Sequence, residues 1–515
     1  MQPKYDLPTI EAARNINLET KPKQVAAWLK RVPLSNPVEA AEEMSDYLTA
    51  ANRAKIPHDH RARMAELLAP AVDETIQALR QQYVAASLPL PARLRRNRQL
   101  AHRLQLETAA MNKLLISEWL SKTFKLGRSP LPNYMLQLLL NLQGALEVSF
   151  ETYENIPPGI WVDAHQTYNH ALRNGLQHVI PEGSPNSMSI EQVYKTMLLT
   201  ALADPYHFPH IELPWAKDII ARFSNLAHLF PAEEQKGKSG LFIIEVNTDA
   251  PPRPLAWERH PINSRWDLML NTTEMVKHLA MLSNHVKNGE DPEKLGLPGA
   301  AKDPAYAGML RRLKLNWGAT SQRQSQRRKV QAGGRTLEAA LGLRTIHKHM
   351  LPSAAERSAL MAGQPDNTPA SPLFRCQTVN DSMGGLALRK LDSSALQIKV
   401  GELAAIRQEN GHWSVGLVRW FRVPEGNDLF FGVQLLAPKC IPVQVSRQGV
   451  ARPWPGLLVQ ASSALKQSAM LITSPGSVQP DQTLSLRSVD GTMTVRTEKQ
   501  LEYTPSAEIY RISLA

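Results

Sequence analysis

The chain has 515 residues, of which 43% are hydrophobic and 21% charged, with 59 Lys and Arg against 47 Asp and Glu. This length predicts three or four domains, and the composition excludes a disordered or low-complexity polymer. No stretch reaches the ~18 apolar residues of a membrane span, and the first thirty residues lack the apolar core of a signal peptide. Two cysteines, Cys376 and Cys440, cannot build a disulfide scaffold, so we expect a cytoplasmic protein.

Residues 1–235 are predicted to form an all-helical region with Pro-rich turns. Asn36-Pro37 is a typical helix start, because Asn caps the first turn and Pro fits the first helical position. The apolar spacing predicts further helices near residues 61–84, 95–124, 133–153, 158–179, 190–203 and 215–229. We expect this region to be an interaction module that binds an unidentified protein partner.

Residues 236–317 have a mixed character and are predicted to connect two larger parts of the chain. Residues 241–246 (LFIIEV) favour a strand, because they form a short β-branched apolar run. Residues 263–285 are predicted to form one helix, with apolar residues from Leu268 to Leu282 on one side. A shorter helix is expected over residues 304–314.

Positive charge is concentrated late in the chain. Residues 301–350 contain eleven Lys and Arg and two acids, a net of nine positive charges. Residues 318–330 (GATSQRQSQRRKV) have no apolar periodicity and predict a flexible basic linker. The charge indicates an anionic partner, which could be a nucleic acid, a membrane surface or a phosphorylated ligand, although a solvated linker would also explain it.

From about residue 334 the pattern is typical of β-structure. Residues 336–350 alternate and are expected to be extended, and residues 352–372 look like a surface insertion. Short apolar segments then recur about every ten residues, which predicts an antiparallel barrel or sandwich. Residues 446–515 continue this pattern as a β extension or a small β-domain. The predicted fold class is therefore multidomain α+β, with an all-helical N-terminal region followed by an antiparallel β-barrel and additional β-structure.

Two short motifs occur together in the basic and β regions. The linker holds Arg323-Gln-Ser-Gln-Arg327, followed by Arg328, and the β region holds Asn380-Asp-Ser382-Met-Gly-Gly385. The order Arg-x-x-x-Arg and then Asn-x-Ser-x-x-Gly, before the strand WSVGLVRW at 413–420 and the segment FGVQLL at 431–436, resembles the PilZ domain family. The resemblance covers residues 318–445, and the 53 positions from Arg327 to Asn380 exceed the gap usual in that family.

The resemblance implies a six-stranded antiparallel barrel that binds the second messenger cyclic di-GMP. Arginine suits this ligand, because its guanidinium can grip the O6 and N7 edge of a guanine with two parallel hydrogen bonds. Glycine permits a tight turn or a close backbone approach. The family pattern, carried over residue by residue, gives Arg323 and Arg327 as a clamp with Arg328 as an accessory, and Asn380, Ser382 and Gly385 as the barrel side of the site.

The sequence favours a cyclic di-GMP effector that is not an enzyme and needs no cofactor. It contains no Gly-x-Ser-x-Gly, phosphate-loop or dinucleotide-binding motif. The histidine pairs lack the Cys or carboxylate spacing of a metal site, so no metal is expected, and no recognised motif indicates nucleic acid. The alternative is a PilZ-like barrel without nucleotide affinity, which would act as a protein- or nucleic-acid-binding adaptor through its basic linker.

Overall fold

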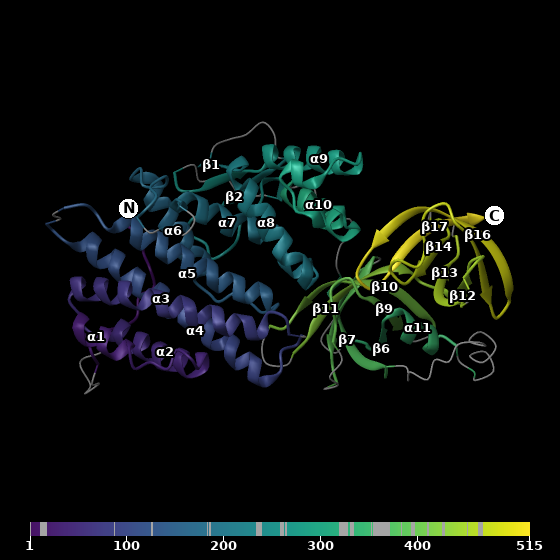
Figure 1. The fold of residues 1–515 in the computed structure, drawn as a ribbon, viewed down its shortest axis with the longest axis horizontal. Coiled ribbons are helices and arrows are strands. Elements are labelled where there is room, and N and C mark those ends of the chain that lie inside the picture. Colours follow the sequence, from purple (N-terminus) through teal and green to yellow (C-terminus); the bar gives the residue numbers. More distant parts are fainter. Residues whose placement is uncertain are drawn as a thin grey trace. The chain divides into compact units, whose positions relative to one another are not determined.

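The structure is a computed structural model, and its parts are shown in Figure 1. It describes residues 2–10, 18–86, 88–124, 127–182, 184, 187–232, 239–257, 262, 265–318, 328–329, 334–351, 353, 371–382, 384–392, 397–408, 411–424, 428–450, 452–461 and 467–515. The chain divides into two compact units, the first of residues 1–205, 214–285 and 312–321, the second of residues 206–213, 286–311 and 322–515.

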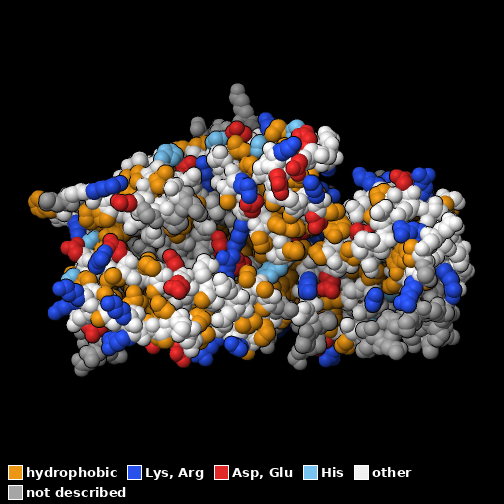
Figure 2. Space-filling view, viewed as in Figure 1, with side chains coloured by type: hydrophobic (Ala, Val, Ile, Leu, Met, Phe, Trp, Pro, Cys, Tyr) orange, Lys and Arg blue, Asp and Glu red, His pale blue; other side chains and the backbone are white. Residues whose placement is uncertain are grey.

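The first unit is mainly helical. Its first eight α-helices are α1 (Pro22–Leu29), α2 (Pro37–Arg53), α3 (His58–Tyr83), α4 (Ala92–Ser121), α5 (Leu131–Glu151), α6 (Ile160–Arg173), α7 (Ile190–Leu202) and α8 (Leu213–Phe223). Helix α2 begins at Pro37 as predicted, although the side chain of Asn36 forms no capping hydrogen bond. Figure 2 shows basic and acidic side chains interspersed over the visible face of these helices, as expected for a solvated surface. None of the helices that the structure describes has the length and apolarity needed to span a bilayer.

A small sheet completes the first unit and corrects one prediction. Its strands are β1 (His228–Pro231), β2 (Leu241–Ile244), β3 (Arg253–Pro254) and β4 (Leu268–Asn271), in the order β1-β4-β2-β3. The single helix expected over residues 263–285 is therefore wrong, because β4 occupies part of that range and α9 begins only at Thr273 (Thr273–Lys287). The side chain of Asn271 accepts a hydrogen bond from the Thr273 amide (2.9 Å), which favours a change of backbone direction at this point.

The loop between β2 and β3 is anchored to helix α6. The carboxylate of Asp249 accepts hydrogen bonds from the amides of Gly159 (2.6 Å) and Trp161 (2.9 Å), so it caps the helix from a distant part of the chain. The buried ring of His165 contacts the Tyr194 hydroxyl through Nδ1 (2.7 Å) and the carbonyl of Ala250 through Nε2 (2.9 Å). Burial lowers the pKa of His165 to about 4, so the ring is neutral in the folded protein.

The second unit contains two antiparallel barrels. Helix α10 (Pro304–Trp317) precedes them in the chain. The first barrel is formed by β6 (Thr336–Leu341), β7 (Phe374–Ser382), β8 (Gly385–Lys390), β9 (Leu403–Arg407), β10 (Trp413–Arg422) and β11 (Phe430–Ala437). The order β7-β6-β9-β10-β11-β8 closes because β8 pairs with β7, and the short strand β5 (Arg328–Lys329) adds to β7. Its interior is filled by residues such as Phe374 and Phe431, which confirms the predicted six-stranded barrel.

One segment of the first barrel differs from its prediction. Residues 336–350 were expected to be extended, but only β6 is a strand, and α11 (Leu343–His349) follows it. Gly342 separates the two with φ of +78°, a conformation that favours glycine. Leu343 and Ile346 are buried at helical spacing, and such a short apolar run fits either a helix or a strand by pattern alone.

The second barrel is closed by β12 (Ile441–Ser446), β13 (Trp454–Val459), β14 (Met470–Thr473), β17 (Glu508–Leu514), β16 (Gly491–Tyr503) and β15 (Thr483–Ser488), in that spatial order. Its interior contains Val443, Leu471 and Leu486 among other apolar residues. A separate apolar cluster joins the two barrels, with Leu403 and Leu417 from the first and Leu457, Ile472 and Ile509 from the second. Together with the helical region, these barrels confirm the predicted fold class.

Candidate functional site

Strand β5 places the end of the basic linker beside the second motif. Its backbone pairs antiparallel with β7, so that Arg328 lies opposite Asp381 and Lys329 lies opposite Asn380. Arg328, which directly follows the arginine motif, is thus a neighbour of the second motif in space although more than fifty residues separate the two in the chain. Arg323 and Arg327 lie outside the described residues, and only the backbone of Arg328 is described.

The other three predicted residues lie on the hairpin formed by β7 and β8. Ser382 pairs directly with Gly385, and the Ser382 hydroxyl donates to the carbonyl of Gly385 (3.3 Å). A Cβ added at Gly385 would lie 2.6 Å from the carbonyl oxygen of Val433 on β11. Gly385 is therefore needed for the close approach of β8 to β11, because any larger residue would push the two backbones apart.

The register of the strands aligns residues of this hairpin with residues on two further strands, so that one row crosses four strands. Asn380 on β7 lies opposite Ala387 on β8, Ala387 lies opposite Gly432 on β11, and Gly432 lies opposite Trp420 on β10. Directly opposed residues in antiparallel strands share one side of a sheet. These residues alternate with the buried interior positions Leu388 and Phe431, so they belong to the outer side of the barrel.

The middle of this row lacks large side chains. A Cβ added at Gly432 would lie 1.9 Å from Nε1 of Trp420, so the indole ring lies directly over the glycine. Trp420 is only partly buried, which leaves part of its apolar surface available at this end of the row. We call Asn380, Ser382, Gly385, Ala387, Gly432 and Trp420 the small-residue face. In the sequence, Trp420 and Gly432 belong to the two segments that resemble PilZ strands, but the sequence assigns neither residue to the site. The pairing of the strands places both on this face.

Two ion pairs involve residues of β7 and β8, the strands of the hairpin that carries part of the small-residue face. Arg335 donates to the carboxylate of Asp381 (3.2 Å), and Arg389 donates to both carboxylate oxygens of Asp428 (2.9 and 3.1 Å). Each of these four side chains is roughly one-third to one-half exposed, so these pairs contribute little to stability and can rearrange at small cost. Guanidinium groups at such positions are suited to hydrogen bonding with an anionic ligand.

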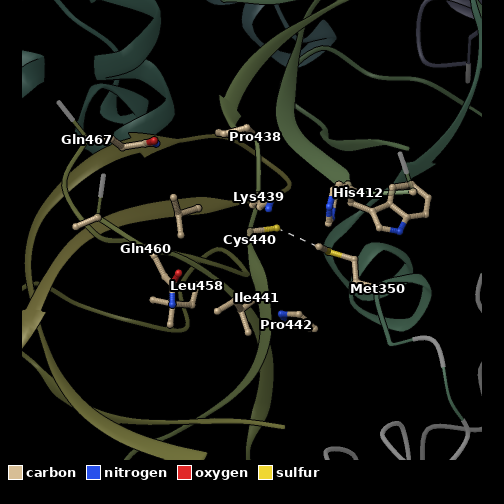
Figure 3. A pocket seen from close by; sticks show the side chains of 14 residues that line it. Met350, His412, Pro438, Lys439, Cys440, Ile441, Pro442, Leu458, Gln460 and Gln467 are labelled. Carbon is tan, nitrogen blue, oxygen red and sulfur yellow. Dashed lines mark hydrogen bonds between the residues drawn. The ribbon is translucent and has the colours of Figure 1, made fainter. Parts of the chain in front are cut away.

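A cavity of about 620 Å³ lies elsewhere in the second unit, between the two barrels (Figure 3). Its wall includes Met350, Trp413, Cys440 and Leu458, and the Sγ atom of Cys440 lies 3.7 Å from Sδ of Met350. One lysine, one histidine and two glutamines are the only polar side chains among its fourteen described lining residues. This mainly apolar lining suits a doubly anionic ligand poorly, and it includes none of the residues predicted from the motifs.

The two thiols give no sign of chemical reactivity. Burial raises the pKa of Cys376 and that of Cys440 to about 12, so both are protonated near neutral pH. Cys376 points into the first barrel, where its thiol contacts the carbonyl of Leu337. Across the part of the chain that the structure describes, no three His, Cys, Asp or Glu side chains are grouped so that they could hold a metal ion.

Comparisons with known proteins assign the domains of the chain to known families. Residues 241–369 and 351–442 match a family model described as the cyclic-di-GMP receptor FimW, middle PilZ domain. The chain belongs to a family of proteins that contain a PilZ domain. The first barrel is therefore its PilZ barrel. Residues 23–233 match the model of the FimW N-terminal domain, and residues 441–515 match that of the FimW C-terminal β-barrel domain.

The similarity to one curated relative extends well beyond the PilZ barrel. The chain is 22% identical over 527 residues to the cyclic-di-GMP receptor FimW of Pseudomonas aeruginosa, a match that covers 88% of this chain and 84% of the relative. The matched models follow one another in the order helical region, PilZ barrel and second barrel. The resemblance predicted for residues 318–445 thus extends to the chain's wider organisation, including the helical region for which the sequence motifs indicate no family.

Proposed function

We propose that this chain is a cyclic di-GMP receptor, without enzymatic activity, that binds the dinucleotide on the small-residue face of its PilZ barrel. The observation that carries the proposal is the pairing of β5 with β7, which brings Arg328 and Lys329, the residues that follow the arginine motif, next to Asp381 and Asn380. The similarity to a protein named as a cyclic-di-GMP receptor supports the same ligand.

The chemistry of this face fits a ligand with two phosphates and two guanines. Trp420 offers an aromatic surface on which a base can stack, and the missing side chain at Gly432 lets the indole lie close against the barrel. The Asn380 amide and the Ser382 hydroxyl are polar groups on β7, at the opposite edge of the face from Trp420. In this proposal, Arg323 and Arg327 bind the phosphates and the guanine edges from the linker, and Arg328 assists them.

Calorimetric titration of the full chain with cyclic di-GMP tests the proposal, with GTP and cyclic AMP as controls for general nucleotide binding. We expect saturable binding of cyclic di-GMP alone. Asn380→Ala and Ser382→Ala should each weaken it, by about 0.5–1.5 kcal/mol for a neutral hydrogen bond or roughly 2- to 12-fold. Thr483→Ala, on an exposed position of the second barrel, is the matched control. A wild-type chain that does not bind cyclic di-GMP at millimolar concentration would refute the proposal.

The proposal also includes coupling between the ligand and the helical region. Residues 318–330 carry four positive charges and connect α10 to the PilZ barrel. A dianionic ligand would neutralise part of this charge, which biases the segment toward one arrangement and can reorient the helical partner-binding module. Hydrogen exchange should then change in helices α1–α8 when cyclic di-GMP is added. If hydrogen exchange changes only in the PilZ barrel, the proposed receptor function stands and the proposed coupling to the helical region is rejected.

The adaptor alternative makes a different prediction for the same protein. Binding of generic double-stranded DNA through the basic linker should be insensitive to sequence and should fall steeply with salt. Strong DNA binding together with no response to cyclic di-GMP would favour the adaptor.

A further inference from the structure

Arg419 occupies an unusual position on strand β10. The pairing of β10 with β11 shifts between Val418 and Trp420, so Arg419 is the extra residue of a β-bulge. Bulges redirect side chains and often occur at functional sites. This bulge directly precedes Trp420, which ends the row of the small-residue face.

The guanidinium of Arg419 bridges two barrels. Its Nε donates to Oε1 of Gln434 on β11 (2.6 Å), while Nη1 and Nη2 donate to the two carboxylate oxygens of Glu502 (3.2 and 3.1 Å). Glu502 lies on β16 of the second barrel, where the pairing with β17 is also irregular. Both side chains are largely shielded from water, and Arg311 lies at the limit of an ion pair with the same carboxylate, at 4.0 Å.

Gln434 connects this ion pair to the predicted site. It lies opposite Gly385, which in turn lies opposite Ser382, so these three residues form a second row across β7, β8 and β11. Arg419 binds the side chain at the end of that row and is the sequence neighbour of Trp420 at the end of the first row. A ligand lying on the small-residue face would therefore have the Arg419 guanidinium at its border.

We propose that Arg419 is an additional ligand-binding arginine that is held by Glu502 until a phosphate replaces the carboxylate. The inference rests on the proposed function, since the anion is a phosphate of the bound dinucleotide. Carboxylate and phosphate accept the same pair of parallel hydrogen bonds from a guanidinium, so one can substitute for the other without loss of geometry. When the phosphate replaces it, the Glu502 carboxylate is released from Arg419. Strand β16 of the second barrel would therefore be the first element outside the PilZ barrel to respond to ligand binding.

A purely structural ion pair would behave differently. If the pair only joins the barrels, Arg419→Gln and Glu502→Gln should both lower stability and neither should change ligand affinity. In the proposed exchange the two substitutions have opposite effects on affinity. Arg419→Gln removes a ligand contact, whereas Glu502→Gln removes the competing negative charge and keeps a side chain of similar size.

A double-mutant cycle measured by calorimetric titration with cyclic di-GMP tests this inference. We expect Arg419→Gln to weaken binding about tenfold or more, and Glu502→Gln to tighten it about three- to tenfold. In the Arg419→Gln background, Glu502→Gln should give no gain, because its effect acts through Arg419. Glu338→Gln is the matched control, since Glu338 pairs with Arg407 (3.1 Å) on the outer side of the same PilZ barrel and should leave affinity unchanged.

The outcomes separate this inference from the proposed function. Suppose that the wild type binds cyclic di-GMP and that the affinity of Glu502→Gln is unchanged or lower. This result would overturn the replacement of Glu502 by a phosphate and would leave the proposed receptor function standing. A gain in affinity that persists without Arg419 would also overturn it, because general electrostatics would then explain the effect. Absence of wild-type binding would refute both proposals. Urea unfolding of each variant verifies folding, and ligand should raise hydrogen exchange over β16 in the wild type but not in Arg419→Gln.

Discussion

The indole of Trp420 lies directly against Gly432, at a position where a Cβ atom would be 1.9 Å from the indole nitrogen. This contact depends on the absence of a side chain at Gly432. We therefore expect Gly432→Ala to displace the indole and weaken cyclic di-GMP binding about tenfold or more, since base stacking on an aromatic ring contributes roughly 1–3 kcal/mol. Tryptophan fluorescence and calorimetric titration would measure the two effects.

The control for this variant is Gly384→Ala. An added Cβ at Gly384 would meet nothing within 4 Å, and its φ is not in the left-handed region. If both alanine variants bind the ligand as the wild type does, Trp420 is not part of the binding face.

The arginine motif gives a prediction that comes from the sequence. Arg327→Ala should cost about 1.5–3 kcal/mol of binding free energy, or roughly 10- to 150-fold in affinity for cyclic di-GMP, because a charged hydrogen bond is lost. Arg323→Lys should also weaken binding, because lysine keeps the charge but cannot reproduce the planar fork. Calorimetry on both variants would reject the clamp if they bind like the wild type, and Arg407→Gln on β9 controls for the loss of one positive charge.

The apolar contact between the barrels predicts that they unfold together. Leu417 is fully buried in the cluster shared by the two barrels although it lies on the outer side of the PilZ barrel. Leu417→Ala should therefore lower the free energy of unfolding by about 2–5 kcal/mol. Hydrogen exchange in urea should show the same loss of protection in both barrels.

Leu514→Ala is the matched control for the barrel contact. Leu514 is 79% exposed, so its truncation should change the free energy of unfolding very little. Loss of protection confined to the PilZ barrel in Leu417→Ala would show that the barrels unfold independently.

The buried His165 predicts a dependence of stability on acid. Burial is the main reason that its pKa falls to about 4 in the folded protein, against about 6.5 for an unfolded histidine. Between these values the unfolded state binds the extra proton, so stability decreases as pH falls from about 6.5 toward 4, by up to ~1.4 kcal/mol per pH unit. His165→Gln should reduce this slope in urea titrations of the full chain, and an unchanged slope would contradict the prediction.

Local patterns in the sequence were sufficient for much of the architecture. The helices from Pro37 onward follow from 3.6-residue periodicity, and the start of α2 also follows from Pro at its first position; these are properties of neighbouring residues. The paired motifs around Arg327 and Asn380 likewise predicted a PilZ barrel, and the comparisons confirm the family. The same local reasoning failed at β4 and α11, because apolar segments of four to seven residues fit a strand or a helix equally well.

The composition of the candidate site depended on tertiary structure. Asn380, Gly432 and Trp420 share one face only because the register of four strands is fixed by barrel closure, and no local pattern encodes that register. Arg419 and Glu502 are 83 residues apart and meet because the outer side of one barrel buries its apolar residues against the other. Sequence by itself therefore determined the elements and the chemistry of the motifs, whereas long-range burial of apolar surface decided which side chains became neighbours.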